Sequence, residues 1–459
     1  MLFNSLAYFL LMALMRMFGY ASCYPGYALL MGSVLFYSIA GWYDTAVFSV
    51  SVILNWALCR FLPANHFRIY AAVLSNIGLL GFFKYTDFFL ASTGIASVST
   101  GYINTALPLG ISFYTFQILA YHIDVVRGIS REVSSFKSFL LFIAFFPQLV
   151  AGPIVRSHQL LPQIEKIFEK KKLRRFRLIS YGLSLFLLGL AKKVVVADSI
   201  APVVDEIFAF GPENIIWAWV GATLFAFQIY CDFSGYSDMA IGSAYLLGIR
   251  LPVNFRTPYL SAGPREFWQR WHITLSNWIR DYLYIPLGGK RGGPFRAGVV
   301  VVLTMAIAGL WHGANITFVV WGTLWGCYIL AARFLDFKGA GYIPRIIFHF
   351  IVTVSLWVLF RAPDMGVALD YYKVMFGFSD GEISSQSFMD ERELLPVLVM
   401  LCGLLYGLHI LEARISSRKM LSLLRHYGGV VYCVAISTMI LLLMMLPNEL
   451  ANPFIYFRF

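Results

Sequence analysis

The chain has 459 residues, of which 59% are hydrophobic and only 13% are charged, and its formal net charge is +12. A soluble domain would carry roughly twice that share of charged residues, and apolar stretches long enough to cross a bilayer of about 30 Å recur along the whole length. This composition excludes a soluble globular protein. The lysines and arginines lie in short loops between apolar stretches, which is typical of cytoplasmic loops and argues against a nucleic-acid partner.

The apolar stretches predict an all-α polytopic membrane protein with roughly 11–13 transmembrane helices plus re-entrant or interfacial helices. The first stretch, residues 1–20, contains Arg16 and has no basic region before it, so we expect a retained span and no cleaved signal. We expect a single integral membrane domain over residues 1–459. The candidate spans are residues 5–22, 26–41, 45–62, 69–91, 105–121, 137–152, 178–191, 194–210, 215–231, 236–250, 297–311, 314–332, 345–361, 394–410 and 428–446.

Three charged loops predict the orientation in the membrane. Residues 165–177 hold seven lysines and arginines and residues 412–425 are also basic, so both should be cytoplasmic. Residues 379–393 hold five acidic residues and one arginine, which is compatible with the outside. One predicted span separates residues 379–393 from residues 412–425, so these two loops should lie on opposite sides of the membrane, as their charges indicate.

The segment "CDFSGYSDMAIG", residues 231–242, places carboxylates in an apolar setting. Such carboxylates need partners, so Asp232 and Asp238 either line a pocket or hold helices together. His122 and Asp124, two positions apart, would point to different sides of a helix, and we interpret them as structural.

Residues 257–294 are more polar than the stretches around them, and aromatic residues interleave there with arginines. At about 100° per residue, Trp268, Trp271, Leu275, Trp278 and Tyr282 share one helical face. The pattern predicts a helix lying in or dipping into the membrane and closed by a turn at residues 286–289. A purely interfacial anchor helix is the alternative.

Most familiar catalytic and metal-binding motifs are absent. The sequence contains no GxSxG and no HExxH, and no histidine is followed by aspartate five positions later. The six cysteines are scattered singly without a CxxC pair, so we expect neither a disulfide framework nor a metal site.

Two histidines, His272 and His312, remain, and each follows a tryptophan. His312 lies in a stretch of 36 residues, 297–332, that holds no other histidine and no Asp, Glu, Lys or Arg. A helix of that length would run about 54 Å, so we expect a break at Gly309 and Gly313 beside a cavity. Imidazole titrates near neutral pH, which suits a general base. On the residues alone, catalysis and ion or proton conduction are equally open.

Several long segments resemble the membrane-bound O-acyltransferase (MBOAT) family, in its alginate or polysaccharide O-acetylation branch. They are "LPLGISFYTFQILAYHIDVVRG", "FPQLVAGPIVR", "DFSGYSDMAIG", "FWQRWHITLSNWIRDYLYIPLGG", "GLWHGANITFVVWG" and "PFIYFRF". The resemblance covers residues 107–459, whereas residues 1–100 match in hydropathy alone. It implies helices around a central tunnel, with His312 at the catalytic position and His272 at the second polar site. By the same resemblance the tunnel or pocket lining is expected to include Trp268, Trp271, Trp311, Asn315, Asp232, Ser234 and Asp238.

The resemblance also implies a bacterial cytoplasmic (inner) membrane enzyme whose acyl donor is acetyl-CoA. A separate extracytoplasmic SGNH-type acetyltransferase would be its partner, and a polysaccharide its acceptor. The chain is short for an alginate-acetylating member, so alginate, cellulose-like exopolysaccharide and peptidoglycan are all open as acceptors. We expect Lys290, Arg291 and Arg296 near the donor phosphates. His312 would act as general base or carry the acetyl group covalently.

Two alternatives accompany this interpretation. One is a member resembling the D-alanine exporter of teichoic acid synthesis, whose donor is a carrier-protein thioester. The other is a transporter without covalent chemistry, in which His312 relays protons.

Overall fold

The computed structural model describes residues 6–21, 24–92, 107–150, 152–169, 176–334, 341–381 and 391–414. Within these ranges all regular structure is helical and no strand occurs, which confirms the all-α class. Eight helical segments in the same ranges are long and apolar enough to cross a membrane. They are Trp42–Phe61, His66–Thr86, Ile179–Phe210, Ile215–Leu246, Gly293–His312, Ile316–Arg333, Tyr342–Arg361 and Leu395–Arg414. The expected span at 428–446 lies outside the described residues, so the total of 11–13 stays a prediction.

The chain divides into two units, of which the first comprises Met1–Leu188 and Tyr236–Val253. Buried amides hold part of it together: Asn55 and Asn76 exchange side-chain hydrogen bonds of 3.1 and 2.8 Å, and His122 Nε2 lies 3.1 Å from Asn55 Oδ1. These contacts give His122 a role in helix packing. Its helices are α1 (Leu6–Ala21), α2 (Pro25–Ser38), α3 (Trp42–Phe61), α4 (His66–Ser92), α5 (Ile111–Val126), α6 (Phe136–Ala144), α7 (Phe146–Leu149), α8 (Ser157–Glu169) and most of α9 (Phe176–Ala191).

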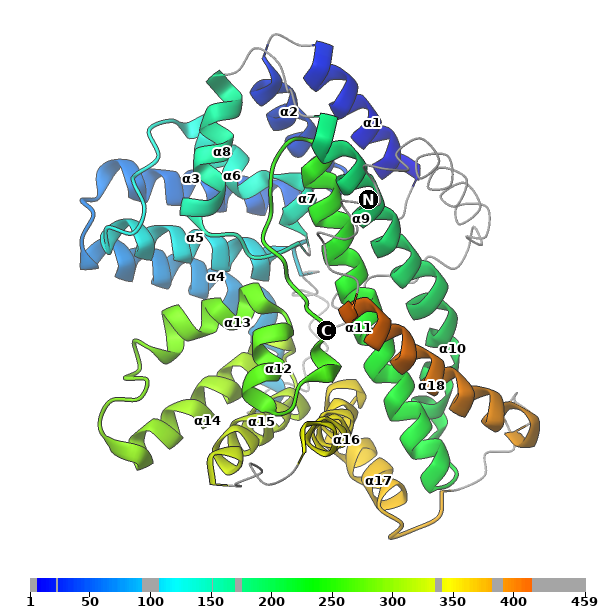
Figure 1. The fold of residues 1–459 in the computed structure, drawn as a ribbon. Helices are drawn as coiled ribbons and strands as arrows, with labels where there is room; N and C mark the ends of the chain where they lie inside the picture. Colours follow the sequence, from blue (N-terminus) through cyan, green and yellow to red (C-terminus); the bar gives the residue numbers. More distant parts are fainter. Residues whose placement is uncertain are drawn as a thin grey trace. The chain divides into compact units, whose positions relative to one another are not determined.

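The second unit comprises Gly189–Gly235 and Asn254–Phe459 and holds both candidate histidines. In Figure 1, α14 and α15 lie side by side as a hairpin, and the short helices α12 and α13 lie beside that hairpin. Its elements are the π-helical turn η1 (Lys192–Ala197), α10 (Asp198–Phe210), most of α11 (Ile215–Leu246), η2 (Pro258–Leu260), α12 (Pro264–Arg270), α13 (Ile273–Ile279), η3 (Arg280–Tyr284), α14 (Gly293–His312), α15 (Ile316–Phe334), α16 (Tyr342–Arg361), α17 (Met365–Met375) and α18 (Glu391–Arg414).

The sequence-based span boundaries are wrong at three places. The expected spans 178–191 and 194–210 form one continuous helical segment through η1, and 215–231 and 236–250 form the single helix α11. The expected span 137–152 is instead the nine-residue helix α6 and the one-turn helix α7, separated at Phe145. Lysines at 192–193 and carboxylates at 232 and 238 lie near the expected boundaries, but Lys193 and Asp232 are buried and all four residues belong to continuous helical segments.

Glycines bring α14 and α15 into close backbone contact. A methyl group at Gly309 would collide with the backbone of Phe318, and one at Gly322 would collide with the carbonyl oxygen of Met305. Gly309 therefore serves helix packing inside α14, and the expected break at this position is wrong. The helix ends three residues later at His312, where Gly313 is extended, so the break expected at Gly313 is confirmed.

The helix expected through the aromatic block is divided in two. Helix α12 ends at Arg270 and α13 begins at Ile273, because His272 adopts the left-handed conformation with φ 40° and ψ 55°. An L-residue with a large side chain adopts this conformation rarely. The expected closing turn is confirmed, since residues 285–290 form turns in which Gly288 and Gly289 have positive φ.

Candidate active site

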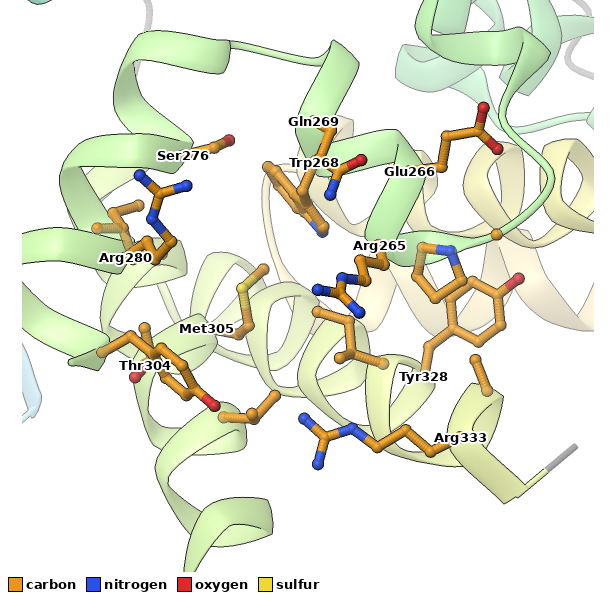
Figure 2. Close-up of a pocket in the computed structure, with 18 of the residues that line it drawn as sticks. Arg265, Glu266, Trp268, Gln269, Ser276, Arg280, Thr304, Met305, Tyr328 and Arg333 are labelled. Atoms are coloured by element: carbon orange, nitrogen blue, oxygen red, sulfur yellow. The ribbon is translucent and has the colours of Figure 1, made fainter. Parts of the chain in front are cut away.

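A cavity of about 1700 Å³ lies within the second unit. Its walls come from α12, α13, α14, α15 and the start of α16, and Figure 2 shows part of this lining. The volume exceeds the roughly 300–1,000 Å³ of most small-molecule pockets. The lining is mainly apolar, and it includes His312, Trp268 and Lys290 from the residues expected at the site.

His312 is the last residue of α14 and is 4% exposed. Three aromatic rings surround its imidazole, with centroid distances of 4.9 Å to Trp311, 5.3 Å to Trp321 and 5.3 Å to Phe360. The Trp321 ring is nearly perpendicular to the imidazole, at 88°. Apolar rings exclude water and the cavity supplies access, so a proton or an acyl group can be exchanged here with a bound molecule.

Positive charge lines the same cavity. Figure 2 shows Arg265 from α12 and Arg333 from the end of α15 extending toward one space, with Arg280 on its other side. The carboxylate of Glu266 is already engaged by Arg270 at 2.5 Å, and Arg280 pairs with Asp281 at 2.7 Å. Four further lining cations make no ion pair within the described part of the chain: Arg265, Lys290, Arg333 and Arg345.

The cations and His312 mark opposite ends of α14. Lys290 precedes the helix, Arg333 and Arg345 lie where α15 ends and α16 begins, and His312 closes α14. Nineteen residue steps separate Gly293 from His312, which is about 28 Å along the helix axis. The cavity can therefore hold an elongated molecule with an anionic end and a reactive end far apart.

Some expected lining residues lie elsewhere. Trp271 packs between aromatic rings, 5.1 Å from Phe255 and 5.0 Å from Trp357, and is not part of the cavity lining. Asn315 caps α15 by accepting from the Thr317 backbone N–H at 3.0 Å, and its amide donates to the Pro363 carbonyl at 2.7 Å. Trp311 contacts His312 from outside the lining.

Of the residues expected to contact the donor phosphates, one lies in the cavity lining and two lie outside it. Lys290 lines the cavity, whereas Arg291 is exposed and lies outside the lining. The Arg296 side chain folds over Gly288 and Gly292.

The carboxylates of α11 also lie apart from the cavity lining. Asp232 forms a buried ion pair with Lys193 of η1, which fits the interpretation as a group that holds helices together. Ser234 is buried, and its hydroxyl has no hydrogen-bond partner among the described residues. Asp238 belongs to the first unit, on the last turns of α11.

His272 lies in the turn between α12 and α13 and is fully buried. Its Nδ1 lies 3.1 Å from Asn254 Oδ1, and the Phe233 ring meets the imidazole edge-on at 4.6 Å. Burial lowers the pKa of His272 to about 3. The structure thus gives the two histidines different surroundings: His312 lines the cavity, and His272 belongs to a hydrogen-bonded turn.

Sequence reasoning did not single out the lining arginines or Tyr328. Tyr328 lines the cavity, and its hydroxyl lies 3.0 Å from Nδ1 of the buried His349. Arg333 and Arg345 flank two spans and resemble ordinary topology determinants. Only the folded hairpin shows that they face the same cavity as His312.

The family model and the similar proteins point to the same family. A model of the MBOAT, membrane-bound O-acyltransferase family, matches residues 126–339, a range that contains His272, His312 and nearly the whole cavity lining. "Probable alginate O-acetylase AlgI" of Azotobacter vinelandii is 38% identical over 79% of this chain and 74% of its own length. The "Peptidoglycan O-acetyltransferase" of Helicobacter pylori is 35% identical over 82% of this chain and 77% of its own length. The "Teichoic acid D-alanyltransferase" of Bacillus subtilis is 28% identical over 48% of this chain and 58% of its own length.

This chain belongs to the membrane-bound O-acyltransferase family, in the branch that contains the alginate O-acetylases. It is a multi-pass membrane protein and an O-acyltransferase. The interpretation as a transporter without covalent chemistry has no support from these relatives.

Proposed function

We propose that this protein transfers acetyl groups from cytoplasmic acetyl-CoA to hydroxyl groups of an extracytoplasmic polysaccharide, in the cytoplasmic membrane of a bacterium. The single observation that carries the proposal is the cavity that joins unpaired cations at one end of α14 to His312 at the other. Coenzyme A has the matching chemistry, because its phosphates are separated from the thioester by a long, thin pantetheine arm.

The cations would bind the phosphates, since guanidinium groups recognise phosphate by charge-assisted hydrogen bonds. The expected orientation puts this end of α14 on the cytoplasmic side, where acetyl-CoA is made. The thioester would then extend along the cavity to His312. The related alginate and peptidoglycan acetylases carry names that support a polysaccharide acceptor. We include a separate SGNH-type acetyltransferase in the proposal as the chain that completes delivery.

Two chemical routes use the same geometry. In the first, His312 removes the proton of the acceptor hydroxyl, the oxygen attacks the thioester carbonyl, and the carbon–sulfur bond breaks. In the second, a nitrogen of His312 attacks the carbonyl and carries the acetyl group before the hydroxyl displaces it. In both routes the CoA thiolate leaves and takes up a proton.

The test is incubation of the purified protein with radiolabelled acetyl-CoA and an oligosaccharide acceptor. We expect release of the CoA thiol, labelled acceptor once the SGNH-type acetyltransferase is added, and loss of both in His312→Gln at equal abundance in the membrane. Label that stays on quenched protein would assign the covalent route. His66→Ala is the matched control, because His66 is exposed at the start of α4. A wild-type protein that ignores acetyl-CoA but releases D-alanine from a carrier-protein thioester would overturn the proposal.

A further inference from the structure

Asn254 makes four hydrogen bonds to the turn that holds His272. Its backbone carbonyl accepts from the Ile273 N–H at 2.9 Å. Its side-chain Oδ1 lies 3.3 Å from the Thr274 N–H, 2.8 Å from the Thr274 hydroxyl and 3.1 Å from His272 Nδ1. The side chain of Asn254 thereby caps α13 in place of His272, which makes no side-chain cap of its own.

These contacts determine which end of the Asn254 amide faces the histidine. A backbone N–H can only donate, so the amide atom that faces Thr274 is the oxygen and not the nitrogen. An amide oxygen only accepts. The proton of a neutral His272 is therefore on Nδ1, and Nε2 carries the lone pair.

The remaining contacts keep the imidazole in this state. Burial lowers the pKa of His272 to about 3, so the ring is neutral at physiological pH. Phe233 lies edge-on to the ring at 4.6 Å and Phe255 stacks on it at 6.2 Å, which restrict its rotation. Nε2 is buried and has no hydrogen-bond partner in the described part of the chain. A buried acceptor left unpaired is costly, so a hydrogen-bond donor is expected at Nε2.

Gln269 and Ile273, on either side of the turn at His272, line the cavity, so the imidazole lies directly behind the cavity wall. We infer that Asn254 is a positioning residue: it fixes His272 as the Nδ1–H tautomer, so that Nε2 accepts a hydrogen bond from a hydroxyl group during acyl transfer. The inference rests on the proposed function, since the hydroxyl belongs to that reaction. Asn254 does not touch the reacting groups and acts only through His272. The left-handed backbone at His272 is held by the same set of hydrogen bonds.

Three variants separate this role from simple support of the turn. Asn254→Asp keeps an oxygen that accepts from Nδ1–H, so we expect kcat within about tenfold of the wild type. Asn254→Leu has similar size but no acceptor, and we expect kcat to fall on the order of 10²-fold or more, the range for a lost proton acceptor. The KM for acetyl-CoA should stay unchanged in both. Thr274→Val removes another bond to the same Oδ1 and should lower the melting temperature with little effect on kcat.

A second measurement does not depend on activity. Nitrogen-15 NMR of histidine-labelled protein, with His272→Asn to identify the signals, reports which ring nitrogen carries the proton. We expect the Nδ1–H form of His272 in the wild type and in Asn254→Asp, and loss of that form in Asn254→Leu. An Nε2–H tautomer in the wild type overturns the inference, as does a kcat in Thr274→Val as low as in Asn254→Leu. A wild type inactive on acetyl-CoA counts against the proposed function, and the tautomer then decides the inference by itself.

Discussion

Lys193 and Asp232 form an ion pair in which the two side chains are only 2% and 3% exposed. Lys193 lies in the π-helical turn η1 and also contacts Asp198 at 2.8 Å, whereas Asp232 lies on α11. Both helical segments are long and apolar enough to span the membrane. Ionised groups within a membrane are costly unless they are paired, so this network joins the two segments at a defined position.

The first prediction concerns the asymmetry of this network. Lys193→Met leaves the carboxylates of Asp198 and Asp232 without their shared cation, and breaking a buried pair in this way typically costs about 3–5 kcal/mol. Asp232→Asn leaves Lys193 paired with Asp198, so it should cost less. Thermal unfolding in detergent measures both variants. Equal melting temperatures for the two would contradict a shared cation.

The same network explains why the sequence predicted the spans of this region incorrectly. Hydropathy identifies apolar stretches, and lysines at 192–193 look like the end of one span and the start of the next. Asp232, the neutralising partner of Lys193, lies on another helix, and so does Glu412, the partner of Lys192. No local pattern reveals which distant carboxylate pairs with which lysine. Where no buried charge intervenes, as in α15 and α16, the predicted and observed spans agree closely.

The candidate site was likewise predictable from the sequence only in part. The isolated position of His312 in an apolar stretch was enough to single it out, and it lines the cavity. The left-handed turn at His272 could not be predicted, because helical periodicity continues through residues 268–282 and Asn254 approaches from an earlier segment. Arg296 was expected at the phosphates because of its place in a basic loop, but its side chain folds over neighbouring glycines.

The second prediction tests the close packing of α14 and α15. A methyl group at Gly322 would meet the carbonyl oxygen of Met305, which is backbone and cannot move without shifting α14. Gly322→Ala should therefore cost about 1–3 kcal/mol, as overpacking does, and should lower activity because α14 carries His312. Gly298→Ala is the control in the same hairpin, since its methyl would be 3.5 Å from the Leu330 side chain. Measured melting temperatures that fall equally in both variants would argue against a special contact at Gly322.

The third prediction follows from the buried, neutral state of His272. Its pKa is about 3 in the folded protein and about 6.5 in an unfolded chain. Between these two pH values the unfolded state therefore binds more protons than the folded state. The stability that neutral His272 contributes is complete above pH 6.5 and is lost as the pH falls toward 3. Asparagine removes the titration and tolerates the left-handed conformation.

The measurement is the melting temperature of the wild type and of His272→Asn across this range. We expect the wild type to lose stability relative to His272→Asn between about pH 7.5 and about pH 5.5, one unit above and below the unfolded value. In His66→Ala, which removes an exposed histidine, the difference from the wild type should stay small throughout. A constant difference between the wild type and His272→Asn would mean that His272 is protonated alike in both states.

The last prediction separates the two groups of cations near the start of α14. Arg265 and Arg333 line the cavity without an ion pair among the described residues, whereas Arg291 and Arg296 lie outside its lining. A hydrogen bond to a charged group contributes about 1.5–3 kcal/mol, and each 1.4 kcal/mol is about tenfold in affinity. Replacing Arg265 and Arg333 together by glutamine should therefore raise the KM for acetyl-CoA at least about tenfold, with kcat nearly unchanged, because the phosphates are far from the chemistry. The Arg291→Gln and Arg296→Gln double variant removes the same net charge and should leave the KM near the wild-type value. A similar rise in both double variants would point to the general positive field of the loop, and a lower kcat at constant KM would place these arginines beside the reacting groups instead of the phosphates.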